Sequence, residues 1–559
     1  MKKSHLALAL VVSLYAVRTG LLAQAIPSAL KAAETSIDGE KIRAHVKFLS
    51  DDLLEGRGPG LRGSELAAKY IATQFALYGL KPGGDDGTYM QQVNFVGMKA
   101  IPEKTSFSLV PKKGEGMSID LHSIDLAYGD DFTVSNRKLT ASVDVDAPIV
   151  FVGYGVTAPE FGWDDYAGVD VKGKVILCIV GDPPSDDPKF FGGKALTYYG
   201  RWTYKFEQAA RMGAVGALII HRTDLASYGW DVVKNSNTSE KTYLRDDKDP
   251  QLEAASWIQL DVAKKIFAAS GMDADRDIVA AGKKGFKAVE LPIRLHAHIE
   301  STVRPFQSPN VVGILPGTKT GKDQAVMYTA HYDHLGFVPG MAGDNIYNGA
   351  ADNATGCGML LEMARAWAQA GVKPPHSVIF ASVAAEEQGL LGSEYLGQHP
   401  PVPAGEIALD INYDMVLPIG VPQQVNVNGA QRTSFYPTVE VTAQRFGLTI
   451  VPDARPEAGS YYRSDHFSLS RVGIPAFSVE TGELYEGHDV AWGRAKLEDF
   501  VAHDYHNFSD NYHADWDFRG NAKLDQFGME LGWEALNAPT TIRWNAGDEF
   551  EAARKASVR

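Results

Sequence analysis

The chain has 559 residues, of which 45% are hydrophobic and 22% charged. This composition is typical of a globular protein, and the length predicts two or more domains. The formal net charge of −15 disfavours partners that are polyanions, namely nucleic acid and anionic membrane surfaces. The sequence has two cysteines, Cys178 and Cys357, which excludes a disulfide framework.

The N-terminal segment 1–25 is predicted to be a secretory signal peptide. Two lysines at positions 2–3 precede an apolar run over residues 6–17, and the tripeptide AQA at positions 23–25 is a small-x-small cleavage site. Arg18 shortens the apolar run, which disfavours a membrane-spanning helix. We therefore expect an exported protein, periplasmic or extracellular, with no membrane anchor.

Residues 38 to about 135 are predicted to begin with two helices on either side of a glycine-rich loop. The helical segments are EKIRAHVKFLSDDLL and SELAAKYIATQFALYG, and the loop between them is EGRGPGLRG. This loop lacks the Gly-Lys-Ser/Thr ending of a phosphate-binding P-loop and follows a helix instead of a strand. We interpret it as a structural turn.

Residues 140 to about 285 are predicted to form a compact α/β or β-rich module. The apolar runs APIVFVGYGV, GKVILCIVGD and VGALIIH alternate with a helical segment, FEQAARMGA. The stretches 183–200 and 222–255 are rich in Asp, Gly, Lys and Tyr and are predicted to be surface loops. No cluster of side chains in this region resembles a catalytic set.

Residues 290 to 559 return to a regular alternation of strands and helices. The predicted strands are AVMYTAH, SVIFASVAA, EIALDINYDMV and GIPAFSVE, and the helices between them include TGCGMLLEMARAWAQAG and PTVEVTAQRFG. This pattern indicates a mostly parallel sheet that is covered by helices on both faces. Ligands of such sheets bind beyond the carboxyl ends of the strands.

Side chains that can bind metal stand at these predicted strand ends and in the loops that follow them. Imidazole suits zinc, and carboxylates allow two ions to be held close together. The pair Glu386-Glu387 follows a buried strand, where two adjacent carboxylates repel each other unless cations lie nearby. One of the pair would bind metal and the other would face the reacting water. The full set is His331, Asp352, Glu386, Glu387, Asp414 and His506.

The motifs that carry these residues resemble those of the M28 family of co-catalytic zinc peptidases. The matching stretches are HYDHLG, YNGAADNATG, AAEEQGLLGS, INYDM and YHNFSD. The segment FLSDDLLEGRGPGLRG is similar to the N-terminal segment of that family, and GYG…WDDYAGVDVKGKVIL is similar to its protease-associated module. The closest resemblance is to the secreted aminopeptidases of the family, which carry this module as an insert.

The resemblance implies a zinc-exopeptidase type of α/β fold. We expect a mixed, mostly parallel sheet sandwiched by helices, with an inserted β-rich protease-associated domain. The implied division is a signal peptide at 1–25, the N-terminal part of the peptidase domain at 26–135, the insert at 136–288 and the main part of the peptidase domain at 289–559.

The resemblance also implies two Zn²⁺ ions per chain, bridged by Asp352. His331 and Asp414 would complete one site, and Glu387 and His506 would complete the other. Glu386 would be the general base.

Two further expectations concern the surroundings of these ligands. Asp333 would orient the imidazole of His331. The peptide bond between Asp352 and Asn353 is expected to be strained and could be cis. Ala351 replaces an acid that is common in the family, at a position that we take to be a non-ligand.

Several other side chains near these motifs have predicted roles at this site. His334 is interpreted as a structural, hydrogen-bonding histidine. His503 and His513 flank His506 and are alternatives for the last ligand. The segment YYRSDHFSL resembles the substrate-pocket segment of the family, in which Tyr462 would assist the oxyanion.

These features predict a secreted metallo-exopeptidase that removes N-terminal residues from peptides. A carboxypeptidase or a dipeptidase of the same fold is the alternative, because Arg463 in the pocket segment could meet a substrate carboxylate. A glutaminyl cyclase has the same fold but handles one zinc and normally lacks the insert. A non-catalytic, receptor-like homologue would show gaps in the ligand set, and this sequence has none.

Overall fold

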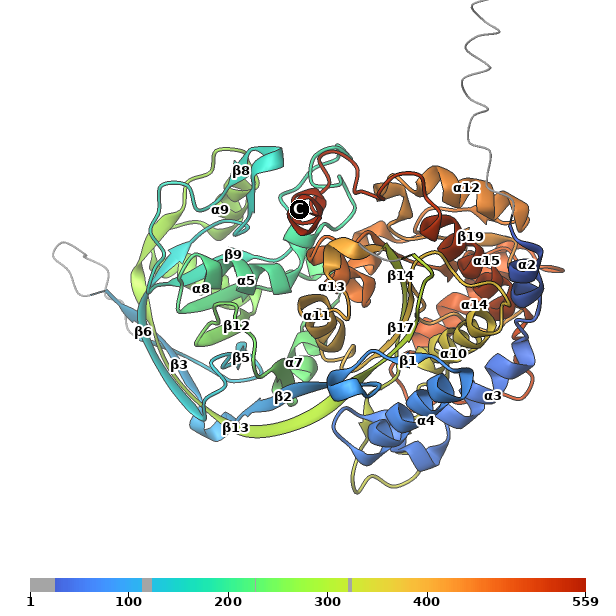
Figure 1. Cartoon of the computed structure of the whole chain (residues 1–559). Coiled ribbons are helices and arrows are strands. Elements are labelled where there is room, and N and C mark those ends of the chain that lie inside the picture. Colours follow the sequence, from blue (N-terminus) through green and yellow to red (C-terminus); the bar gives the residue numbers. More distant parts are fainter. Residues whose placement is uncertain (1–25, 113–122, 227, 320–323, 559) are drawn as a thin grey trace, which may run out of the picture.

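The computed structural model describes residues 26–112, 123–226, 228–319 and 324–558 (Figure 1). The predicted signal peptide lies outside the described residues. The chain folds into two α/β units whose sheets share one long strand, β13 (Val289–Leu315). Among the helices that the structure describes, none is long and apolar enough to cross a membrane.

The peptidase-like unit has the expected mostly parallel sheet. The strand order is β21-β18-β14-β17-β13, and every neighbouring pair is parallel except β17 and β13. The three central strands are buried along their whole length, which explains why their sequences are continuous apolar runs. The four strands predicted from the sequence are β14 (Ala325–His331), β17 (Val378–Val383), β18 (Ile407–Asn412) and β21 (Ala476–Ser478).

Helices cover both faces of this sheet, as predicted (Figure 1). In β14, Val326 and Tyr328 point into one hydrophobic layer and Met327 points into the other. The first layer contains α3 (Gly39–Leu49), α4 (Arg62–Tyr78), α10 (Thr355–Ala368) and α15 (Arg519–Leu536), and the second contains α11 (Leu391–Gln398) and α13 (His466–Arg471).

The second unit also has a parallel sheet at its centre. Its order from the shared strand is β13-β6-β9-β10-β12-β5, in which the first pair (β13 and β6) and the last pair (β12 and β5) are antiparallel and the pairs between them are parallel. The central strands are β6 (Ser142–Phe151), β9 (Val175–Ile179), β10 (Gly216–Ile220) and β12 (Ala254–Ile258), and the helices of this unit include α5 (Trp202–Arg211) and α8 (Leu260–Ala269).

Strands from the N-terminal side of residue 136 also belong to the second unit. These are β3 (Ser106–Pro111), β4 (Ile124–Leu126) and β5 (Phe132–Ser135). β3 pairs with β13, and β5 pairs with β12. The domain boundaries at 136 and 288 therefore remain a proposal. The sheet of the second unit begins with β3, about 30 residues before the first of these boundaries.

Arg57 ties the glycine-rich N-terminal loop to the loops at the strand ends. Its side chain is buried, with 1% exposed. The guanidinium donates hydrogen bonds to the carbonyl oxygens of Tyr332 at 2.7 Å, Asn348 at 2.6 Å and Gly349 at 2.9 Å, and to that of Leu49. The loop that the sequence predicts as a structural turn thus supplies a fixed cation beneath the candidate site.

Replacing Arg57 by methionine should destabilise the protein strongly. The change leaves buried carbonyl oxygens without a donor, at roughly 1–3 kcal/mol for each group that stays unsatisfied, so we expect a loss of at least about 3 kcal/mol. Arg62→Met is the matched control, because Arg62 lies in the same segment with 72% of its side chain exposed. Urea unfolding measures both, and equal midpoints for the two variants would contradict this role of Arg57.

Candidate metal centre

The six side chains predicted at strand ends converge on one place in the structure. His331 is the last residue of β14, the pair Glu386-Glu387 follows β17, and Asp414 follows β18. These strands are parallel, so their carboxyl ends meet at one edge of the sheet. Asp352 lies in the turn before α10, and His506 follows α14 (Val490–His503).

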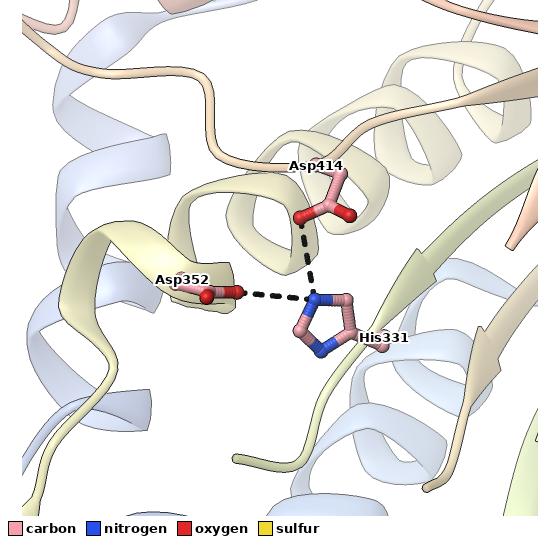
Figure 2. A group of neighbouring side chains, drawn as sticks. All are labelled: His331, Asp352 and Asp414. Carbon is pink, nitrogen blue, oxygen red and sulfur yellow. Dashed lines mark hydrogen bonds and ion pairs between the residues drawn. The ribbon is translucent and has the colours of Figure 1, made fainter. Parts of the chain in front are cut away.

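The first group of side chains is built around His331. Its Nε2 atom lies 3.2 Å from Asp352 Oδ1 and 3.3 Å from Asp414 Oδ1, and Figure 2 shows both carboxylates pointing at this nitrogen. Its Nδ1 atom is 3.1 Å from the carbonyl oxygen of Asp333, to which it donates a hydrogen bond. That bond directs Nε2 toward the two acids.

Asp333 contacts the imidazole of His331 through its backbone and not, as expected, through its carboxylate. The carbonyl oxygen of Asp333 contacts the imidazole of His331, whereas its carboxylate accepts a hydrogen bond from the backbone N–H of Ala385. The carboxylate is fully buried, and burial raises its pKa to about 7. Asp333 therefore supports two loops at once, the one after β14 and the one before the glutamate pair.

The second group shares Asp352 with the first. His506 Nε2 lies 3.3 Å from Asp352 Oδ2 and 2.9 Å from Glu387 Oε2. The two oxygens of Asp352 thus face two different histidines. The other oxygen of Glu387, Oε1, is 2.7 Å from His334 Nδ1. His334, which the sequence predicts to be a structural, hydrogen-bonding histidine, therefore contacts the predicted ligand Glu387.

The structure distinguishes His506 from the two histidines that flank it in sequence. His503 lies on α14 with 71% of its side chain exposed, and its Nδ1 is 2.9 Å from Asp499. His513 packs against the ring of Trp516. Of the three, His506 is the one whose ring nitrogen contacts the carboxylates of the centre.

The two adjacent glutamates occupy different electrostatic environments. Burial, together with the charges of Glu387 and Asp414, raises the pKa of Glu386 well above its ordinary value. Burial also acts to raise the pKa of Glu387, but the charges of His506 and His334 hold it at about 2. Among the described residues, no hydrogen bond reaches the Glu386 carboxylate, whose Oε2 is 4.0 Å from His331 Nε2.

The turn that carries Asp352 is fixed by hydrogen bonds from both sides. The carboxylate of Asp510 accepts from the backbone N–H groups of Ala351 at 2.8 Å and Asp352 at 3.0 Å. The amide of Asn353 donates to the carbonyl oxygen of Tyr413 at 2.9 Å. The peptide bond between Asp352 and Asn353 is cis, as the resemblance implied.

The donor set fits divalent zinc. His331, Asp352 and Asp414 offer ligand atoms that all lie within 4.8 Å of one another, and so do His334, Asp352 and Glu387. Within the part of the chain that the structure describes, histidines are the only basic groups in ion-pair contact with these carboxylates. Buried carboxylates need compensating cations, and zinc takes imidazole nitrogen and carboxylate oxygen as ligands.

Two tyrosines stand in different relations to the centre. The hydroxyl of Tyr462 donates to Glu549 Oε1 at 2.8 Å, so the predicted oxyanion role of Tyr462 stays untested. The ring of Tyr505 stacks on the imidazole of His506 with centroids 3.8 Å apart. Burial, together with the charges of Asp352, Glu387, Glu386 and Asp414, raises the pKa of its hydroxyl well above the ordinary value. The sequence offered one signal for Tyr505, its position directly before His506.

Comparison with known proteins identifies the segment that carries the centre. Residues 310–525 match the sequence profile described as Peptidase family M28. Leupeptin-inactivating enzyme 1 of Streptomyces exfoliatus is 26% identical over 251 residues, which cover 43% of this chain and 51% of that protein. Aminopeptidase YwaD of Bacillus subtilis is 28% identical over 223 residues, which cover 38% of this chain and 43% of that protein.

A probable zinc metalloprotease of Pyrenophora tritici-repentis is 35% identical over 118 residues, which cover 21% of this chain and 26% of that protein. The matched segments thus span about half, or less, of these curated relatives. The solved aminopeptidase from Aneurinibacillus sp. strain AM-1 aligns with 92% of this chain and 96% of its own, at 19% identity and a TM-score of 0.46.

That TM-score is too low to transfer the role of any residue from the solved structure. The profile match is specific, and all six converging side chains lie inside its limits. Residues 310–525 of this chain therefore belong to peptidase family M28.

Proposed function

We propose that this protein is an exported, zinc-dependent aminopeptidase that removes N-terminal residues from peptides. The observation that carries the proposal is the position of Asp352, whose two oxygens face His331 and His506 at 3.2 and 3.3 Å. A carboxylate between two histidine–carboxylate groups is suited to bridge two metal ions. The family of residues 310–525 and the zinc peptidase names of the relatives support the same reading.

Each ion would be held by a histidine, a carboxylate and the shared Asp352. His331 and Asp414 would complete one site, and Glu387 and His506 would complete the other. When bound, two zinc ions would polarise the scissile carbonyl and lower the pKa of the attacking water.

Glu386 is suited to be the general base. Its carboxylate is largely buried and meets no hydrogen-bond donor among the described side chains, and it lies beside His331. It is therefore available to accept a proton from the attacking water and to pass that proton to the leaving amine. Glu387, which contacts His334 and His506, is already engaged.

A carboxypeptidase or dipeptidase is the second candidate, and one observation favours it. Arg463 stands directly before Ser464, whose hydroxyl donates to Asp414 Oδ2 at 2.6 Å. A guanidinium at this position is within reach of a substrate bound at the metal centre. A non-catalytic homologue is disfavoured, because the ligand set and the base are complete.

The purified protein should contain close to two zinc ions per chain. A chelator should abolish hydrolysis of an amino-acid anilide and lower the melting temperature, because bound metal contributes to folding free energy. Added zinc or cobalt should restore both. Elemental analysis and an activity assay test this, and full activity in protein free of transition metal would refute the proposal.

The two glutamates should differ when each is changed to glutamine. Glu386→Gln should keep its zinc and its melting temperature while kcat falls by at least about 10²–10⁴-fold, the usual contribution of a general base. Glu387→Gln should lose zinc and thermal stability as well, because a ligand is removed. Loss of metal from the Glu386 variant alone would reverse the two roles.

The two tyrosines provide a further comparison. We propose that the hydroxyl of Tyr505, whose ring stacks on His506, donates to the oxyanion. Tyr505→Phe should then lower kcat by roughly 10-fold or more, because this donor is removed, with zinc content unchanged. Tyr462→Phe should mainly lower the melting temperature, because the hydroxyl gives up its bond to Glu549. The opposite pattern, with the larger loss of kcat in Tyr462→Phe, would assign the oxyanion role to Tyr462.

A further inference from the structure

Two arginines from different units of the molecule stand on segments that pack against each other beside the metal centre. Arg201 stands directly before α5 in the second unit, and Arg463 is the last residue of η10 (Ser460–Arg463) in the peptidase-like unit. The position after Arg463 is Ser464, which donates a hydrogen bond to Asp414. The sequence did not single out Arg201, which follows a stretch predicted to be a surface loop.

The segments that carry the two arginines pack against each other. The backbone N–H of Leu196 donates to the carbonyl oxygen of Pro456 at 3.1 Å. The ring of Tyr198 lies 5.2 Å from that of Phe467 and 6.5 Å from that of Tyr462, measured between centroids. In Figure 1, α5 of the second unit and α13 of the peptidase-like unit face each other across this junction.

The two guanidinium groups have no counter-charge. Within the described residues, neither Arg201 nor Arg463 forms an ion pair, and the Nε atom of Arg201 is buried without a hydrogen-bond partner. Burial and the charge of Arg463 lower the pKa of Arg201 to about 10, while the charge of Glu386 acts in the opposite direction.

The junction does not need these two arginines as ion pairs. Another arginine, Arg471, already links the units, because its Nη2 lies 3.2 Å from Glu207 of α5 and its Nη1 lies 3.6 Å from Glu394 of α11. Arg463 is exposed, whereas the Nε atom of Arg201 is buried without an acceptor, and a buried guanidinium nitrogen without an acceptor is costly. The planar fork of arginine is suited to bind a carboxylate through two hydrogen bonds.

We propose that Arg201 and Arg463 together bind a carboxylate of the peptide substrate. The second unit would then supply part of the substrate pocket, and short peptides with a free carboxyl terminus would be preferred. This inference rests on the proposed function, since it places a peptide at the metal centre. An acidic side chain next to the scissile bond offers the same chemistry, and the substrates below separate the two sources.

Three substrates of one series test the proposal by turnover. Leu-Ala has a free terminal carboxylate, Leu-Ala amide has none, and Leu-Glu amide has a carboxylate only on its side chain. The wild-type protein should prefer Leu-Ala to Leu-Ala amide. Arg201→Gln, Arg463→Gln and the double variant should reduce that preference by at least about 10-fold, mainly through KM, because one partner of a charge pair is removed.

Two exposed cations on the same segments provide matched controls. Lys194→Gln precedes Arg201 and Arg455→Gln precedes Arg463, and both residues are exposed. Neither control should change the preference by more than about twofold, because neither residue is adjacent to Ser464 or to the start of α5. Zinc content and melting temperature are measured for every variant, and Arg463→Lys, which keeps the charge without the fork, should retain part of the preference.

Equilibrium binding separates this inference from the proposed function. Calorimetry with the zinc-loaded Glu386→Gln variant measures the affinities for Leu-Ala and its amide without turnover. If Leu-Ala binds more tightly than its amide, and this difference disappears when both arginines are changed, the carboxylate site is supported. That conclusion holds even if the wild-type protein hydrolyses none of the peptides, a result that would refute the proposed peptidase activity. Equal binding and equal turnover of acid and amide would overturn the carboxylate site while leaving the peptidase intact.

The third substrate identifies the source of the carboxylate. A preference for Leu-Glu amide over Leu-Ala amide that the double variant loses would assign the arginine pair to acidic side chains. Equal turnover of the two amides, with Leu-Ala preferred, would assign the pair to the carboxyl terminus. A preference of either kind that persists in the double variant would overturn the inference.

Discussion

The concentration of negative charge around Asp352 is the constraint on which the rest of this structure depends. Asp352 is 3% exposed and Glu386 is 8% exposed, and two more carboxylates, those of Glu387 and Asp414, lie in the same cluster. Ionised carboxylates are costly to bury, and close neighbours repel one another. The histidines offset part of this cost, and divalent cations would offset the remainder.

The surrounding backbone holds this unfavourable arrangement in place. The carboxylate of Asp510 accepts hydrogen bonds from backbone N–H groups in the turn before α10. The guanidinium of Arg57 donates hydrogen bonds to carbonyl oxygens of the loop that leads to this turn. Both contacts join segments that are far apart in the sequence. Because hydrogen bonds fix the loops, the acidic side chains cannot relax away from each other, and a site with this geometry is preorganised for its ligands.

The shared strand β13 explains how a second unit can contribute to the same centre. Its residues 289–300 pair with β6, residues 301–311 with β2 and residues 311–315 with β17, so the two sheets are parts of one continuous sheet. This continuity places the second unit beside the peptidase-like unit, and the contacts of Arg471 with Glu207 and of Leu196 with Pro456 join the two near the start of α5.

The sequence by itself determined the central strands and several of the side chains that gather at their ends. Buried parallel strands are continuous apolar runs such as AVMYTAH, and predicted ligands such as His331 and Asp414 stand at or just after a strand end. The family motifs also favoured His506 among three late histidines, and the structure brings its ring nitrogen to Asp352 and Glu387. These features are local, since a strand, its end and a short motif are all encoded within about ten residues.

Only the tertiary structure decided which distant side chains meet. Periodicity reports whether a residue is buried but does not identify its partner, so the pairing of β3 and β5 with the second sheet was not predictable. The same limit applies to the contact of His334 with Glu387 and to the packing of the segments that carry Arg201 and Arg463, which lie 262 positions apart in the printed sequence. The first contact exists because parallel strands bring their carboxyl ends to one sheet edge, and the second because the strand β13 joins two separately encoded units.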